Sequence, residues 1–292
     1  MTKPALIVTG LNGLIGSRFH LDYQNNYTIT SFDISDPGQP VDITQKEQVL
    51  KACEASNASH IIHFAAYTDV TGAWKQRNDK SGPAYQVNVV GTRNIVEACN
   101  QTNKHLIHIS TAYVFDGKKE ALYTENDQPN PIEWYGYTKT EAENVVQSNA
   151  KDWTILRIDQ PFRSDTIKRP DIIRRIVNSI RNNTLMPQFT NHTFGPTYIN
   201  DLSKVLDWVI RTKATGLFHA SSGEKWTDFD FASAVVETLS LPAVITKGDL
   251  FEYLKTLERP YQQNTALSSE KLQNALDFSL MSIRDALKEV TL

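Results

Sequence analysis

Short runs of bulky apolar residues alternate with helical patterns through the first 160 residues, and this alternation restricts the fold more than any other feature. Strands are expected at residues 5–9, 28–33, 60–65, 105–110 and 154–158, and helices at residues 12–22, 45–56, 84–102 and 135–149. Such alternation is typical of βαβ units, in which crossover helices connect parallel strands. The runs at 61–65 and 106–109 are almost uninterrupted in bulky residues, as strands covered on both faces are. The sequence therefore predicts an α/β protein with a doubly wound parallel sheet.

The second half of the chain is less regular. Helices are expected at residues 171–183 and 228–239, a strand at 216–220, and another helix after Asn200 and Asp201, whose side chains can cap it. Residues 247–263 have the composition of a surface segment. We expect a nucleotide-binding domain at 1–160 and a mainly substrate-binding lobe at 161–292, with segments near 190–240 returning to the first domain.

The composition argues against several classes of protein. The formal net charge is -3 and no long basic run is present, which argues against a nucleic-acid or membrane-surface binder. No stretch is long and apolar enough for a signal sequence or a bilayer span, so a cytoplasmic protein is expected. Cys53 and Cys99 lie in helical patterns and are interpreted as small buried side chains rather than as a disulfide.

Three glycines stand between the first expected strand and the first expected helix. Gly10, Gly13 and Gly16 are spaced Gly-x-x-Gly-x-x-Gly, a variant of the Rossmann dinucleotide fingerprint. Glycines here allow a tight turn and a close approach of the backbone to a pyrophosphate, beside the free N–H groups of a helix start. Any tight strand-to-helix turn favours glycine, but the strand before and the helix after support a Rossmann-type site.

An acidic residue ends the second expected strand. A carboxylate at the position of Asp33 accepts hydrogen bonds from the adenosine ribose and repels a 2′-phosphate. No arginine or lysine stands beside it, which predicts NAD as the preferred cofactor, with NADP possible because Arg18 lies near the glycine turn. The competing interpretation is an aspartate in a surface turn.

Tyr135 and Lys139 lie four residues apart on an expected helix, so both project from one face. An ammonium near a phenol favours the phenolate and lowers the pKa of the tyrosine, which could then donate a proton to a carbonyl oxygen. Ser110 and Thr111 end the fourth expected strand, at the sheet edge where such folds bind ligands, and could hold that oxygen. An isolated Tyr-x-x-x-Lys match is usually an exposed helix pair, so the three features count only together.

These motifs resemble the extended short-chain dehydrogenase/reductase family. The matching phrases are Thr9-Gly10-x-x-Gly13-x-x-Gly16, His63-Phe64-Ala65-Ala66 and Tyr135-Gly136-x-Thr138-Lys139. Within that family the chain is similar to the dTDP-4-dehydrorhamnose reductase branch. The phrases for this branch are Ser110-Thr111-Ala112-Tyr113-Val114-Phe115-Asp116-Gly117, Gly195-Pro196-Thr197-Tyr198-Ile199-Asn200-Asp201-Leu202 and Arg259-Pro260.

The resemblance implies roles for residues at matching positions. It implies Thr111, Tyr135 and Lys139 as the catalytic set and Thr111, Tyr113 and Arg259 on the substrate side. It implies cofactor contacts at Gly10, Asn12, Gly13, Leu14, Ile15, Gly16, Asp33, Asp42, Ile43, Phe64, Ala65, Ala66, Tyr67, Tyr135 and Lys139. Asn88 matches a helix asparagine that supports the site, although a helix-bending or capping role is an equal alternative.

The implied activity is NAD(P)H-dependent reduction of a keto group on a nucleotide-linked 4-keto-6-deoxy sugar, by a possible homodimer. The branch usually has aspartate where this chain has Ala112, which leaves the sugar open. Two alternatives remain: a nucleotide-sugar epimerase, and a non-catalytic dinucleotide-binding subunit resembling the methionine adenosyltransferase beta subunit. No metal is expected, because His60/His63 and His105/His108 lie three apart on strands and point to opposite faces.

The C-terminal half contains several cations that could meet a diphosphate. They are Arg163, Lys168, Arg169, Arg174, Arg175 and Arg259. Guanidinium groups often bind phosphates, but the cluster at 168–175 is interpreted as solvated surface charge. Arg259 is the favoured substrate ligand, because Pro260 restricts its backbone and the family motif includes it.

Overall fold

A six-stranded parallel sheet forms the centre of the protein. The structure is a computed structural model that describes residues 3–38, 40–166 and 169–292. The strand order is β10-β5-β4-β3-β1-β2. The strands are β1 (Ala5–Thr9), β2 (Thr28–Phe32), β3 (His60–His63), β4 (His105–Thr111), β5 (Trp153–Ile158) and β10 (Gly216–His219). The α/β class and the doubly wound parallel sheet are confirmed, and each expected strand is present within about two residues.

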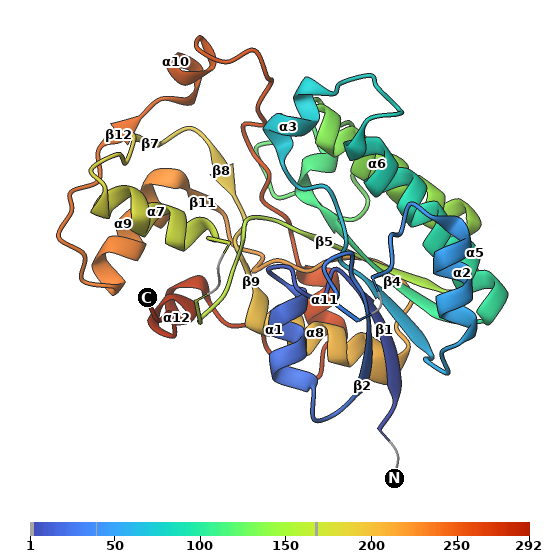
Figure 1. Cartoon of the computed structure of the whole chain (residues 1–292). Helices are drawn as coiled ribbons and strands as arrows, with labels where there is room; N and C mark the ends of the chain where they lie inside the picture. The colour runs from blue at the N-terminus through green and yellow to red at the C-terminus, as the bar shows by residue number, and fades with distance from the viewer. Residues whose placement is uncertain (1–2, 39, 167–168) are drawn as a thin grey trace.

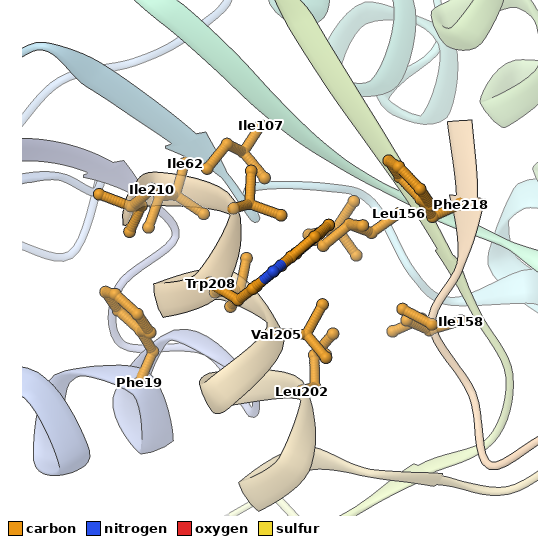
Figure 2. Packing of buried hydrophobic residues seen from close by; sticks show 14 of the residues in the cluster. Phe19, Ile62, Ile107, Leu156, Ile158, Leu202, Val205, Trp208, Ile210 and Phe218 are labelled. Atoms are coloured by element: carbon orange, nitrogen blue, oxygen red, sulfur yellow. The ribbon is translucent and has the colours of Figure 1, made fainter. Parts of the chain in front are cut away.

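Helices cover both faces of this sheet (Figure 1). The helices α2 (Lys46–Glu54), α5 (Thr92–Thr102) and α6 (Trp134–Asn149) cover one face, and α1 (Gly16–Tyr23) and α8 (Ile199–Thr212) cover the other. Figure 2 shows the core on the second face, where Trp208 of α8 lies among Leu156, Val205 and Phe218. The rings of Trp208 and Phe218 meet edge-on, with their centroids 6.0 Å apart. Burial on both faces explains the almost continuous apolar runs of the central strands.

A smaller lobe packs beside the carboxyl ends of the strands (Figure 1). Its helices are α7 (Ile172–Arg181), α9 (Asp228–Thr238), α10 (Leu250–Leu254) and α12 (Ile283–Lys288). Its core surrounds Phe194 and Phe231, both fully buried. The elements α8 and β10 follow α7 in sequence but lie with the main sheet. The domain division at residue 160 stays a prediction.

Short strand pairs join the segments of the lobe. They are β6 (Pro161–Phe162) with β9 (Thr197–Tyr198), β7 (Gln188–Phe189) with β12 (Lys247–Gly248), and β8 (Thr193–Phe194) with β11 (Trp226–Thr227). Further short elements are α3 (Val70–Lys75), η2 (Ala112–Val114) and α11 (Glu270–Ala275). Nowhere in the described ranges is there a helix with the length and apolar character needed to cross a bilayer.

Two helix starts differ from the sequence prediction. The first helix begins at Gly16 rather than at residue 12, because the preceding residues form a tight turn in which Gly13 N donates to Gly10 O at 3.0 Å. Helix α8 begins at Ile199, so Asn200 and Asp201 lie inside its first turn and do not cap it. The carboxylate of Asp201 instead accepts the backbone N–H of Met281 at 2.6 Å.

The helix expected at 84–102 consists of three parts. They are α4 (Pro83–Tyr85), a π-helical segment η1 (Gln86–Gly91) and α5. A π-helical turn inserts one residue into the regular repeat, so side chains on either side of it no longer share one continuous stripe. The approximate stripe in the sequence therefore indicated a helix but not this interruption.

Candidate active site

A cavity of about 650 Å³ opens at the carboxyl ends of the strands. It lies beside β1 and β3, where the strand order reverses, which is the place where open α/β sheets bind ligands. Its volume suits a small-molecule site. Of the expected site residues, the lining contains Gly10, Gly13, Leu14, Ile15, Gly16, Asp33, Phe64, Ala65, Ala66, Thr111, Tyr113, Tyr135, Lys139 and Arg259.

Gly10 brings the first turn against the end of β3. Its φ is +66°, and a Cβ there would lie 2.8 Å from Ala65 N, closer than a side chain can approach. Thr9 reinforces the contact, because its hydroxyl accepts the N–H of Ala65 at 3.0 Å. Glycine at this position therefore allows the first turn to pack closely against the backbone at the end of β3. It leaves backbone, rather than side chains, facing the space where a pyrophosphate would lie.

Asp33 is fixed at the cavity edge by local hydrogen bonds. Its carboxylate accepts the N–H of Ser35 at 2.9 Å and the N–H of Asn12 at 3.2 Å. Burial alone would raise the pKa of Asp33, but hydrogen bonds from Ser35 and Asn12 lower it overall. Arg18, named above as a possible NADP feature, pairs with Asp22 and Asp165 instead. The cavity edge therefore carries the anionic side chain that the sequence predicted.

Four expected cofactor residues do not line the cavity: Asn12, Asp42, Ile43 and Tyr67. Asn12 supports Asp33 through its backbone, and Asp42 accepts the N–H of Thr44 at 2.9 Å. Ile43 is buried, and the backbone N–H of Tyr67 donates to Asn88. Direct contact between these residues and a cofactor stays a prediction.

Helix α6 begins beneath the cavity with a buried acidic cap. The carboxylate of Glu133 accepts the backbone N–H groups of Tyr135 at 2.8 Å and Gly136 at 2.6 Å. A Cβ at Gly136 would lie 2.1 Å from the carbonyl oxygen of Tyr113, so only glycine fits. Burial raises the pKa of Glu133 to about 7, although these N–H groups and Arg259 oppose the shift. The cap and the glycine set Tyr135 beside the end of β4.

The three expected catalytic residues lie together in the cavity lining. Thr111 is a neighbour of the Tyr135 phenol, its hydroxyl accepts the N–H of Tyr113 at 3.2 Å, and Lys139 follows Tyr135 one turn later on α6. Burial raises the pKa of Tyr135, the charge of Glu133 raises it further, and the neighbouring Thr111 hydroxyl opposes the shift. The Lys139 ammonium was expected to lower this pKa, but the environment that the protein itself provides raises it.

The side chain of Lys139 is hydrogen-bonded to the backbone of β4. Its Nζ donates to the carbonyl oxygen of Ile109 at 2.8 Å and lies 3.4 Å from His108 Nε2. Burial lowers the pKa of Lys139 to about 8, while the carboxylate of Glu143 raises it. Burial and the Lys139 charge hold the pKa of His108 well below its ordinary value, so His108 is a neutral neighbour.

Four histidines form two tilted ring pairs between the neighbouring strands β3 and β4. His63 and His108 lie in register on β3 and β4 with ring centroids 5.3 Å apart, and His60 and His105 lie 5.2 Å apart. His63 bonds to the hydroxyl of Thr9 at 2.7 Å. The described residues include no group of three or more metal-ligating side chains.

Asn88 is a structural link from the π-helical segment to the active site. Its side chain accepts the N–H of Tyr67 at 2.8 Å and donates to the hydroxyl of Thr138 at 2.9 Å. It is buried, and it therefore connects the segment after β3 to the helix that carries Tyr135. π-Helical turns often occur at functional sites because they redirect a side chain in this way.

The part of the cavity beside Arg259 is aromatic and cationic. The rings of Tyr113 and Tyr135 meet edge-on at 5.8 Å, and Arg259 lies over the ring of Tyr261 at 5.0 Å. Burial raises the pKa of Tyr261 to about 12. Ala112 is fully buried in the apolar cluster with Val114 and Phe115, so it brings no polar group to this space.

The arginines that the sequence offers as possible diphosphate ligands fall into two groups. Arg169, Arg175 and Arg259 line the cavity. Arg163 and Arg174 are buried, and Arg174 donates to the carbonyl oxygen of Ser164 at 2.8 Å. The surface interpretation was therefore wrong for Arg174, which has a structural role. Lys168 lies outside the described residues.

Several lining residues were absent from the sequence analysis. Asp159 and Gln160 follow β5, Thr68 follows β3, and Tyr261 follows Pro260. The rule that ligands bind beyond the carboxyl ends of parallel strands could have indicated the residues after β3 and β5. Residues 247–263 have the composition of a surface segment, but the last part of this segment turns inward, and Gln262 is buried.

Comparisons with known proteins agree with this geometry. The family model described as the RmlD substrate binding domain matches residues 4–291. A dTDP-4-dehydrorhamnose reductase from Aggregatibacter actinomycetemcomitans is 27% identical over 98% of this chain and 97% of its own length. A low-salt glycan biosynthesis reductase from Haloferax volcanii, named as probable, is 28% identical over 96% of this chain and 95% of its own length.

One solved structure and one further relative are also similar to this chain. The dTDP-4-dehydrorhamnose reductase from Bacillus anthracis, in complex with NADP, has a TM-score of 0.88 and 25% identity, covering 98% of each chain. Methionine adenosyltransferase 2 subunit beta from Mus musculus is 26% identical over 92% of this chain and 81% of its own length. The resemblance to the dTDP-4-dehydrorhamnose reductase branch is confirmed, and the chain belongs to the RmlD substrate binding domain family.

Proposed function

We propose that the protein is an NAD(P)H-dependent reductase of a nucleotide-linked 4-keto-6-deoxy sugar, similar to dTDP-4-dehydrorhamnose reductase. The observation that carries the proposal is that Thr111, Tyr135 and Lys139 line one cavity that also reaches Asp33. The two reductase relatives, each matching almost the full chain, support the same reaction.

The residues fit a dinucleotide. The close backbone contact at Gly10 and the start of α1 provide a pyrophosphate site, and Asp33 provides an acceptor for ribose hydroxyls. When bound, the cofactor supplies the hydride for the keto carbon. We propose NAD as the preferred form, because the Asp33 carboxylate would repel a 2′-phosphate and Arg18 pairs elsewhere. The Bacillus anthracis relative was solved with NADP, so this preference is a feature proposed for this chain alone.

The chain's own residues orient the carbonyl and move one proton. Thr111 holds the keto oxygen, and Tyr135 donates its phenolic proton to that oxygen as the new C–H bond forms. The charge then left on the Tyr135 oxygen is stabilised by the ammonium of Lys139. The buried setting that raises the pKa of Tyr135 keeps it protonated and therefore ready to donate.

The alternatives share the fold but differ in outcome. An epimerase would oxidise and then reduce its sugar with no net consumption of NADH. A regulatory subunit resembling the methionine adenosyltransferase relative would bind a dinucleotide without turnover. The complete set of Thr111, Tyr135 and Lys139 in one cavity favours catalysis, because a subunit that only binds does not need a proton donor.

The test is NADH oxidation by the purified protein with a dTDP-4-keto-6-deoxy sugar generated in the assay. Tyr135→Phe is expected to lower kcat at least about 100-fold, because general acid catalysis contributes about 10² to 10⁴ in rate. Tyr137→Phe is the matched control, since Tyr137 stacks on Trp134 with ring centroids 4.8 Å apart and does not line the cavity. Turnover without net NADH loss would indicate the epimerase, and binding without turnover the regulatory subunit.

The cofactor preference is tested by titrating the same protein with NADH and NADPH. We expect tighter binding of NADH, and a loss of that preference in Asp33→Ala. Tighter binding of NADPH by the unmodified protein would contradict the proposed role of Asp33.

A further inference from the structure

A buried carboxylate in the cavity has no role in the proposed proton transfer. Asp159 is the first residue after β5, and it belongs to the cavity lining although only 2% of the residue is exposed. The pairing of Thr111 with Ile158 places Asp159 one residue beyond the strand neighbour of the catalytic threonine. It is therefore close to the place where the reacting sugar would lie.

One oxygen of this carboxylate is fixed by the protein. Its Oδ2 accepts the hydroxyl of Thr265 at 2.6 Å and the N–H of Gly195 at 3.0 Å. The backbone N–H of Asp159 also donates to the hydroxyl of Thr197 at 3.0 Å. These bonds come from two separate segments of the C-terminal half, so they define the orientation of the whole carboxyl group.

The other oxygen is buried and accepts no hydrogen bond. Oδ1 of Asp159 has no partner of good geometry within the described residues, and water has almost no access to it. Leaving a buried acceptor unsatisfied costs about 1–3 kcal/mol, and more for a charged group. Burial raises the pKa of Asp159 to about 7, although Thr265, Gly195, His192 and Gln160 oppose the shift. A ligand that donates a hydrogen bond to Oδ1 would remove this cost.

The surroundings favour a neutral donor over a cation or an anion. The charge of Asp159 acts on the phenols of Tyr113, Tyr135 and Tyr261, which surround the same space. Arg259 already lies over Tyr261 as the nearby cation. An aromatic wall with one fixed acceptor oxygen is a common arrangement for binding a sugar ring, whose C–H face packs on aromatic rings while its hydroxyls donate.

We propose that Oδ1 of Asp159 accepts a hydrogen bond from a hydroxyl group of the substrate's sugar ring and so selects for a sugar with a hydroxyl at that position. The inference deepens the proposed function and rests on it for the class of ligand. Asp159 is a specificity-determining residue here, because it receives the substrate while Tyr135 and Thr111 act on the reacting oxygen.

The test compares binding of dTDP-rhamnose with binding of dTDP, by calorimetry, in the full-length protein and in two variants. Asp159→Asn keeps the size and the acceptor for Thr265 but removes the charge, and Asp159→Ala removes both oxygens. We expect the ratio of the two dissociation constants to change by about 10-fold in Asp159→Asn and more in Asp159→Ala. Affinity for dTDP alone and for NADH is expected to stay unchanged in both variants.

Binding is measured without turnover, so this test stays separate from the reductase assay. A protein that fails to oxidise NADH but shows the expected change in the ratio would support the role of Asp159 and contradict the reductase. An unchanged ratio, an equal loss of dTDP and dTDP-rhamnose affinity, or no preference for dTDP-rhamnose in the unmodified protein would each overturn the inference. Asp201→Asn is the matched control, because Asp201 is also a buried aspartate but does not line this cavity, and its carboxylate accepts the N–H of Met281.

Discussion

Lys139 combines a charge with almost complete burial, and this makes its protonation the residue-scale feature most sensitive to pH. Its pKa is lowered to about 8 by burial, against the raising effect of Glu143. Because the ammonium stabilises the charge that forms on Tyr135, kcat/KM is expected to fall as the pH rises through about 8 and Lys139 loses its proton. A pH–rate profile from pH 6 to 10 measures this descending limb.

The variant Lys139→Arg keeps a charge throughout that range, since guanidinium groups stay protonated. We expect lower activity in this variant, because the larger group does not fit the space beside Ile109 and His108, but no descending limb near pH 8. If kcat/KM of the variant still falls near pH 8, a group other than Lys139 is responsible for the descending limb.

Residue types at fixed spacing explain which site residues the sequence could predict. Tyr135, Lys139 and Thr111 carry a spacing and a strand-end position that indicate chemistry, and all three line the cavity. Asp159 and Glu133 have no such spacing, and their importance arises from burial and from partners distant in sequence. Only packing reveals a buried carboxylate, because the same residue in a solvated loop would have an ordinary pKa.

At the scale of elements, helix α6, which carries Tyr135 and Lys139, is joined to the sheet by a buried ion pair. Arg157 of β5 donates to both oxygens of Glu143, at 2.9 Å and 2.6 Å, and both side chains are almost fully buried. Removing one partner of such a pair leaves an uncompensated buried charge and typically costs about 3–5 kcal/mol. We expect Glu143→Gln to lower the free energy of unfolding by about that amount, measured by chemical denaturation.

The same substitution has a second consequence for Lys139, one turn away on α6. Since the Glu143 carboxylate raises the pKa of Lys139, its removal is expected to move the descending limb of the pH–rate profile to lower pH.

The double variant Glu143→Gln/Arg157→Met is the control for the stability measurement, because it removes both charges and is expected to recover part of the lost free energy of unfolding. A loss below about 1 kcal/mol in the single variant would contradict the pairing.

The elements themselves were predictable where a repeat was regular. The six sheet strands and the long helices followed from alternating apolar runs, because burial on both faces leaves a clear pattern. The π-helical segment Gln86–Gly91 could not be predicted, since a single inserted residue leaves no periodic pattern in the sequence. The two-residue strands of the lobe could not be predicted either, because they are too short to show an alternation. The capping role expected for Asn200 and Asp201 failed because tertiary contacts to Ser164 and Met281 take these side chains instead.

On the scale of the whole molecule, Arg163 connects the C-terminal half to the glycine turn. The buried guanidinium donates to the carbonyl oxygen of Leu14 at 3.0 Å and to the hydroxyl of Ser17 at 2.8 Å. It also forms two bonds with Asp165, and Asp165 reaches back to Arg18 of α1 at 3.2 Å. The segment after β6 therefore braces the turn that the pyrophosphate would contact, although the two are about 150 residues apart in sequence.

Arg163→Met is expected to loosen that brace without removing a residue of the cavity lining. The variant removes the guanidinium donor from the Leu14 carbonyl and from the Ser17 hydroxyl, which keeps its own bond to Gly13 O, so we expect a loss of about 1–3 kcal/mol in the free energy of unfolding. A loosened turn must become ordered again when NADH binds, and this ordering costs free energy. If the cost is about 1.4 kcal/mol, NADH binds about tenfold more weakly.

Arg181→Met, at the exposed end of α7 in the same lobe, is the control. It is expected to change the free energy of unfolding and the affinity for NADH by only a small amount. NADH titration followed by fluorescence, together with thermal unfolding with and without NADH, measures both effects. Unchanged NADH affinity in a destabilised Arg163→Met would mean that the contact supports the fold alone, whereas weaker binding would place the control of the cofactor turn in the C-terminal half.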